Sequence, residues 1–298
     1  MAQLPEPFTY RDVDADGTTI HTAVGGEGPP VLLLHGYPQS SVMWRDVAPA
    51  LARDHTVVVT DLRGYGESDK PAPDEANRRY AKREMAADQV AVMRSLGFDR
   101  FDLVGHDRGA RVAHRLTLDH PDAVSRLAVL DIVPTRHVFT HVDRALAHGY
   151  FHWFFLATGG DVPETLLAGA PEFWIRTMVE RLLAPGVTIA DDVMADYVRY
   201  FSDPACIAAT TADYKAGASS DLEDDEVSWD AGDRVACPLL VLWGEHGFVG
   251  KAYEPVAVWQ DYATDVTGRA MPSGHFIPEE APEQVVSELQ GWLTPREQ

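Results

Sequence analysis

The sequence predicts an α/β protein with a mostly parallel sheet, flanked by helices and carrying an inserted helical cap. Short apolar runs alternate with helical patterns along most of the chain. In one middle segment the strand pattern stops and aromatic-rich helical patterns replace it. With 298 residues, 45% of them hydrophobic, the chain is long enough for one large domain with such an insertion.

The apolar runs are typical of buried strands, and their βαβα order implies a parallel sheet that is covered on both faces. These runs are Val31–His35, Thr56–Thr60, Phe101–Gly105, Leu127–Ile132 and Leu239–Gly244. An antiparallel hairpin is expected ahead of them, formed by Phe8–Val13 and Thr19–Val24 around Asp16-Gly17. Helical patterns cover Met85–Leu96, Gly109–His120 and Pro282–Leu293.

The helical insertion sets the predicted domain boundaries. Residues 133–228 are expected to form the cap, and residues 1–132 together with 229–298 the core. The cap contains the stretches HGYFHWFFLA and PEFWIRTMVERLL and ends near the acidic run Asp221–Glu226.

Composition excludes several classes of partner. The formal net charge of −21 disfavours nucleic acid and anionic membrane surfaces, since the long-range field repels polyanions. A small anionic substrate stays possible, because salt screens that field beyond about 8 Å and local arginines can overcome it. Cys206 and Cys237 fit neither a disulfide framework nor a zinc site. With no export signal or apolar span in the sequence, we expect a soluble cytoplasmic protein without a metal or cofactor.

The segment Gly105-His106-Asp107-Arg108-Gly109 follows a predicted strand and precedes a predicted helix. This is the context of a nucleophile elbow, in which small residues let the backbone turn sharply under a reactive side chain. That side chain is Asp107, and a carboxylate can displace a leaving group from a saturated carbon. The simpler interpretation, an aspartate that caps the helix, is weaker because a histidine stands where such an enzyme needs its base.

That histidine is His275, in a loop before the last helix, and the chain order of nucleophile, acid and histidine is that of a hydrolase triad. Gly247 occupies the usual place of the acid, so Asp131, at the end of the neighbouring strand, is the predicted partner and Glu245 the fallback. Backbone N–H groups of Tyr37 and Arg108 are expected to form the oxyanion hole.

Arg108 and Arg111 lie at the start of the helix that follows Asp107, so both can reach the same space. An anionic nucleophile repels an anionic substrate, and two cations would hold both; the alternative is an ordinary ion pair between Asp107 and Arg111. In the cap, His152, Trp153 and Tyr214 could donate hydrogen bonds to a departing halide, although cap aromatics often only fill a core.

These motifs resemble the fluoroacetate dehalogenases (haloacetate dehalogenases) of the α/β-hydrolase superfamily. The resemblance runs through most of the chain. It rests on HGYPQSSVMW, DLRGYGESD, GHDRGARV, LAVLDIVPT, HWFFLA, DYKAGA, LWGEHG and SGHFIPEEAPEQ, in the family's order. DRGAR, HW and the tyrosine of DYKAGA are the most specific, and Tyr37 stands where relatives often carry phenylalanine.

The resemblance implies an α/β-hydrolase fold, a homodimer, and hydrolysis of a haloacetate to glycolate and halide. The roles that it implies are catalysis by Asp107, Asp131 and His275, carboxylate binding by Arg108 and Arg111, and halide binding by His152, Trp153 and Tyr214.

Three alternatives remain open. An epoxide hydrolase would use the same aspartate and histidine with cap tyrosines, among Tyr150, Tyr197, Tyr200 and Tyr214. A haloalkane dehalogenase commonly has a tryptophan where Arg108 stands. A non-catalytic receptor would bind a small carboxylate without turning it over, and the complete set of nucleophile, base and acid argues against it.

Overall fold

A computed structural model describes residues 2–293 of the chain. Its centre is an eight-stranded sheet with the order β1-β2-β4-β3-β5-β6-β7-β8. The strands are β1 Thr9–Ala15, β2 Thr18–Gly25, β3 Pro30–Leu34, β4 Thr56–Thr60, β5 Phe101–His106, β6 Val124–Leu130, β7 Leu239–Gly244 and β8 Val266–Met271. The β1–β2 hairpin is antiparallel, as predicted, and β2 pairs antiparallel with β4. All other neighbours are parallel, which confirms the predicted sheet.

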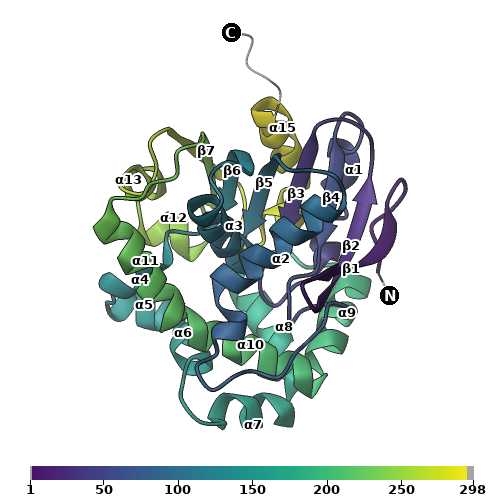
Figure 1. Ribbon diagram of the computed structural model, residues 1–298. Helices are drawn as coiled ribbons and strands as arrows, with labels where there is room; N and C mark the ends of the chain where they lie inside the picture. Colours follow the sequence, from purple (N-terminus) through teal and green to yellow (C-terminus); the bar gives the residue numbers. More distant parts are fainter. Residues whose placement is uncertain (1, 294–298) are drawn as a thin grey trace.

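Side chains of the central strands alternate between two hydrophobic cores, one on each face of the sheet. On β3, Leu32 and Leu34 belong to one core and Val31 and Leu33 to the other. Helices α2 (Lys82–Ser95), α3 (Asp107–Asp119) and α13 (Pro255–Gln260) contribute to the first core, and α1 (Ala48–Leu51) and α15 (Pro282–Leu293) to the second (Figure 1). Burial on both faces explains why these strands are continuous apolar runs.

The chain between β6 and β7 is helical, as the sequence predicts. Its helices are α4 Thr135–Thr140, α5 Arg144–Gly149, α6 Phe151–Leu156, α7 Val162–Gly169, α8 Pro171–Leu182, α9 Asp191–Phe201, α10 Pro204–Gly217 and α11 Ser220–Ala231. Figure 1 shows α6 to α10 gathered at one end of the sheet, opposite α15. The predicted core and cap boundaries stay a prediction, and α11 continues past residue 228 to Ala231.

The remaining elements are short. They are the 3₁₀ helices η1 Ser41–Trp44 and η2 Arg78–Tyr80, and the α-helices α12 Phe248–Ala252 and α14 Ile277–Glu280. Across residues 2–293, no helix is both long and apolar enough to cross a membrane.

The predicted strand at Leu127–Ile132 is present as β6, but its bounds differ from those predicted. The strand was predicted to extend to Ile132, but β6 ends at Leu130. Asp131 has a left-handed backbone, with φ of 54°, which turns the chain out of the extended conformation. This turn leaves Asp131 at the carboxyl edge of the sheet, where β3 and β5 also end.

Candidate active site

Asp107 lies on a sharp turn between β5 and α3. Its φ of 45° is unusual for a residue with a side chain. The turn is possible because the flanking residues Gly105 and Gly109 have no side chain to collide with the closely packed backbone. A Cβ on Gly105 would lie 2.6 Å from the Ala110 Cα, and one on Gly109 would lie 2.3 Å from the His35 carbonyl oxygen. The N-cap of α3 is His106, so Asp107 does not serve as the cap of this helix. The predicted strand, turn and helix are all present.

The Asp107 carboxylate is buried beside donors and cations. Its Oδ2 accepts a hydrogen bond of 3.0 Å from the backbone N–H of Tyr37, one of the two expected oxyanion-hole donors. Burial alone would raise the pKa of Asp107, but the nearby positive charges of His275, Arg108 and Arg111 outweigh it and lower the pKa. The group is therefore ionised at neutral pH, as a nucleophile must be.

His275 lies in the loop between β8 and α14, with Nε2 4.0 Å from Asp107 Oδ2. Its Nδ1 is 2.6 Å from Asp131 Oδ2, and the other Asp131 oxygen accepts the Gly244 N–H at 2.9 Å. Burial lowers the pKa of His275, but the hydrogen bond and charge of Asp131 raise it above its ordinary value. The fallback acid, Glu245, is half exposed and pairs with His246 instead.

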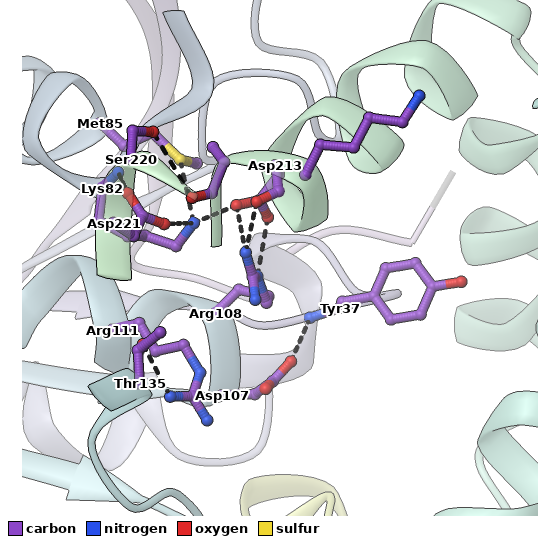
Figure 2. A network of polar contacts seen from close by, with 12 residues as sticks. Tyr37, Lys82, Met85, Asp107, Arg108, Arg111, Thr135, Asp213, Ser220 and Asp221 are labelled. Atoms are coloured by element: carbon purple, nitrogen blue, oxygen red, sulfur yellow. Dashed lines mark hydrogen bonds and ion pairs between the residues drawn. The ribbon is translucent and has the colours of Figure 1, made fainter. Parts of the chain in front are cut away.

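The two arginines are buried but differ in their partners (Figure 2). Arg108 forms a two-pronged ion pair with Asp213 of α10, through Nε to Oδ2 at 2.9 Å and Nη2 to Oδ1 at 2.5 Å. Arg111 donates from Nη1 to the Val133 carbonyl oxygen and the Thr135 hydroxyl, and its buried Nε has no hydrogen-bond partner within residues 2–293. Burial lowers the pKa of Arg111 somewhat, which leaves the guanidinium protonated at neutral pH. Neither arginine forms an ion pair with Asp107.

The three cap residues expected at the halide site are buried together. His152 and Trp153 lie on α6 and Tyr214 on α10, and the Tyr214 ring is 6.0 Å from that of His152 and 6.2 Å from that of Trp153. The Arg111 guanidinium lies over Trp153 at 4.4 Å. Burial raises the pKa of Tyr214 and lowers that of His152 to about 3, so both side chains are neutral. The His152 Nδ1 is buried and has no hydrogen-bond partner among residues 2–293.

Sequence reasoning missed two residues that contact this set. One is Asp213, whose only signal was its position directly before Tyr214. The other is His106, whose Nε2 lies 2.7 Å from the His275 carbonyl oxygen. This hydrogen bond helps to fix the loop that carries His275. Among residues 2–293 there is no cluster of metal-ligating side chains large enough to hold an ion.

A family model described as the alpha/beta hydrolase fold matches residues 29–282. The chain belongs to the α/β-hydrolase family. Within this family it is 44% identical to a Burkholderia sp fluoroacetate dehalogenase, over 97% of this chain and 95% of the relative. It is also 33% identical to a soluble epoxide hydrolase of Corynebacterium sp. (strain C12), over 97% of this chain and 98% of the relative.

Solved α/β-hydrolase structures agree with this assignment. A crystal structure from Nostoc sp PCC 7120, provisionally named an alpha/beta hydrolase, superposes with a TM-score of 0.95 at 47% identity, covering 97% of this chain and 99% of the other. The predicted fold class and superfamily are thereby confirmed. The chain is a hydrolase by family, related to both dehalogenases and epoxide hydrolases.

Proposed function

We propose that the protein hydrolyses haloacetates, converting fluoroacetate to glycolate and fluoride. The observation that carries the proposal is Arg111, a buried cation near the buried Asp107 carboxylate, whose Nε has no hydrogen-bond partner in the described part of the chain. A free donor on a buried guanidinium needs an acceptor, and a substrate carboxylate supplies one. The similarity to the Burkholderia fluoroacetate dehalogenase supports the same assignment.

In the first step, Asp107 displaces the halide. Its Oδ2 is held by the Tyr37 N–H, which leaves Oδ1 to attack the halogen-bearing carbon. A bond forms between Oδ1 and that carbon while the carbon–halogen bond breaks, and the halide leaves with the electron pair. Arg108 and Arg111 hold the substrate carboxylate, and His152, Trp153 and Tyr214 donate to the halide.

In the second step, water hydrolyses the ester on Asp107. His275, oriented by Asp131, takes a proton from the water, whose oxygen attacks the Asp107 Cγ. The negative charge that develops on Oδ2 is stabilised by the Tyr37 N–H and, as we propose, by the Arg108 N–H. The intermediate expels glycolate, which receives the proton from His275, and the regenerated Asp107 releases its own proton to solvent.

Halide release is the direct test. Purified protein should release fluoride from fluoroacetate, measured with an ion-selective electrode, while Asp107→Asn releases none. Binding of the substrate by folded wild-type protein without any halide release, from fluoroacetate or chloroacetate, would instead indicate a receptor that only binds carboxylates.

Epoxide hydrolysis is the second candidate. It is favoured by the buried phenols Tyr150 and Tyr214, whose pKa values burial raises and which could protonate an epoxide oxygen, and by the Corynebacterium relative. A panel of neutral epoxides separates the two functions. Turnover of epoxides with no halide release from haloacetates would replace the dehalogenase assignment.

We also propose that the protein is a homodimer, as the resemblance to fluoroacetate dehalogenases implies. Light scattering of the purified protein gives its mass in solution, and a monomer mass at working concentrations would reject the dimer.

A further inference from the structure

Asp213 is a fully buried carboxylate on α10 that accepts hydrogen bonds from three other parts of the chain. Figure 2 shows two of the donors, Lys82 and Arg108. Arg108 of α3 donates to both of its oxygens, and Tyr65 donates to Oδ2 at 2.7 Å. Lys82, the first residue of α2, donates to Oδ1. These interactions hold the pKa of Asp213 well below its ordinary value in spite of burial. Asp213 thus joins the helical insertion to two helices of the core.

The same contacts restrict the Arg108 guanidinium. Asp213 occupies its Nε and Nη2, and the Asp213 carbonyl oxygen accepts a further bond from Nη2 at 2.8 Å. The Tyr214 ring lies under the guanidinium carbon at 4.3 Å, and a Cβ on Gly217 would lie 3.2 Å from Nη2. Within residues 2–293, Nη1 is the one guanidinium nitrogen of Arg108 without a hydrogen-bond partner. The guanidinium therefore has one orientation and one free donor group.

Charges around Asp213 are balanced. Lys82 lies between Asp213 and Asp221, with Nζ 3.4 Å from Asp221 Oδ2, so two cations face two carboxylates. Arg111, in contrast, has no carboxylate oxygen within 4.0 Å in the described part of the chain. Arg108 is thus neutralised before any substrate arrives, whereas Arg111 keeps its charge available to an anion.

We propose that Asp213 is a positioning residue that fixes Arg108 so that Nη1 alone serves a bound carboxylate. This inference rests on the proposed carboxylate site. It assigns the two arginines different tasks: Arg111 supplies the attracting charge, and Arg108, held by Asp213, fixes the orientation of the small acid. Asp213 itself does not touch the substrate, and it acts through Arg108.

The test is the dissociation constant of acetate, a carboxylate without a leaving group, measured by isothermal titration calorimetry. Asp213→Asn removes the two-pronged partner and lets the guanidinium turn, so the dissociation constant should rise about tenfold, the worth of one charged hydrogen bond. If the protein dehalogenates chloroacetate, KM should rise by a similar factor with a smaller change in kcat, because the contact is remote from the reacting carbon.

Asp221→Asn is the matched control, since it makes the same change in a buried carboxylate that contacts Lys82 but not Arg108. Its acetate affinity should equal that of the wild type. If Asp213→Asn fails to fold, Lys82→Met combined with Asp213→Asn removes one charge of each sign and should show the same weakened binding.

Acetate affinity in the Asp213 variants that is unchanged, or tighter because the freed Arg108 charge outweighs its lost orientation, would overturn the inference. Equal weakening in Asp221→Asn, or no acetate binding by the wild type, would overturn it as well. Acetate binding that depends on Asp213, without halide release from any haloacetate, would reject the dehalogenase function and leave the role of Asp213 intact.

Discussion

Gly36 packs so closely against Asp107 that it leaves no room for even a methyl side chain. A Cβ on Gly36 would lie 2.6 Å from the Asp107 Cβ, so Gly36→Ala must displace the nucleophile. We expect kcat for halide release to fall by about 10²-fold with the fold retained, since a shift of that size commonly costs this much. Gly169→Ala, where a Cβ meets open space, is the control and should match the wild type in steady-state assays. Equal activity of the two variants would show that the close packing at Gly36 is unimportant.

The pKa of His275 depends on Asp131. In the wild type that pKa is raised above its ordinary value, and the neutral form that the proposed base requires predominates only above the raised pKa. Asp131→Asn removes the charge that raises it, and the acid limb of ester hydrolysis should move to lower pH. The rate should also fall by about 10²-fold or more, because the ring loses its orientation.

Pre-steady-state measurement of ester hydrolysis across pH gives both quantities for the Asp131 variant. Glu245→Gln is the comparison, as Glu245 is the other acid that the sequence allowed. A change in that variant, with Asp131→Asn unaffected, would reverse the assignment.

Most of the candidate catalytic residues were recognisable in the sequence from their residue types and local motifs. Asp107 and His275 stand in local motifs, and Asp131 follows an apolar run. The Asp213 partner of Arg108 was not predictable, because 105 positions separate the two residues and an aspartate within a helix has no local signature. Its role depends on how α10 packs on α3.

At the scale of elements, α6 and α10 bring the proposed halide donors together. Trp153→Phe keeps an aromatic ring against Tyr150 and Arg111 but removes the indole N–H. Fluoride is a strongly hydrated leaving group, so the rate of fluoride departure should decrease more than that of bromide when the donor is missing. We expect kcat for fluoroacetate to fall about tenfold further than kcat for bromoacetate.

Halide release from the two substrates under saturation measures that ratio. Phe139→Leu, which changes another ring packed on Trp153, controls for altered packing. A uniform loss for both halides would mean that Trp153 contributes packing rather than a hydrogen bond.

Strands buried on both faces of the sheet were predictable from their apolar runs, whereas the bounds of the edge strand β8 were not. The strand β7 has the predicted bounds because Leu239–Gly244 is apolar throughout. The strand β8 at this edge, Val266–Met271, is mostly exposed, and Thr267, Gly268 and Arg269 interrupt its apolar residues, so no continuous apolar run indicates it. Similarly, β6 ends where Asp131 turns the backbone, a geometry that apolar content does not report.

For the whole molecule, a buried acid links stability to pH. Burial raises the pKa of Glu279 to about 7, against 4.5 for the free group, and Tyr197 and Gln39 bond to its carboxyl. The Gln39 amide nitrogen donates to Glu279 Oε2, and the amide oxygen lies 3.0 Å from Nδ1 of His106. The hydrogen bonds from Tyr197 and Gln39 favour the ionised carboxylate, but burial outweighs them and keeps the pKa of Glu279 raised.

The sign of this effect follows from the raised pKa. Between pH 4.5 and about 7 the folded state binds a proton that the unfolded state has lost, so this group's contribution to stability decreases as pH rises through that window. Glu279→Gln cannot ionise and mimics the protonated acid. Its stability relative to the wild type should therefore increase between pH 5 and pH 8, on the order of 1 to 3 kcal/mol.

Urea unfolding at the two pH values measures this change for the Glu279 variant, with the exposed Glu283→Gln as control. A relative stability that is independent of pH, or that decreases with pH, would contradict a protonated Glu279.

The overall architecture was predictable because alternating apolar runs and helical patterns have few stable arrangements. The substrate was less predictable, because the same nucleophile, base and acid serve dehalogenases and epoxide hydrolases alike. The observation on which the proposed dehalogenase function rests is a buried arginine with an unused donor, and only the packed structure reveals that its Nε has no hydrogen-bond partner within residues 2–293.

The central claim is that Asp107 forms a covalent ester with a haloacetate and His275 hydrolyses it. Intact-protein and peptide mass spectrometry of His275→Asn after exposure to fluoroacetate tests it most directly. The account predicts a mass gain of one carboxymethyl group, located on the peptide that contains Asp107 and absent from the Asp107→Asn, His275→Asn double variant. A folded His275→Asn protein that releases halide without any mass gain would contradict the mechanism.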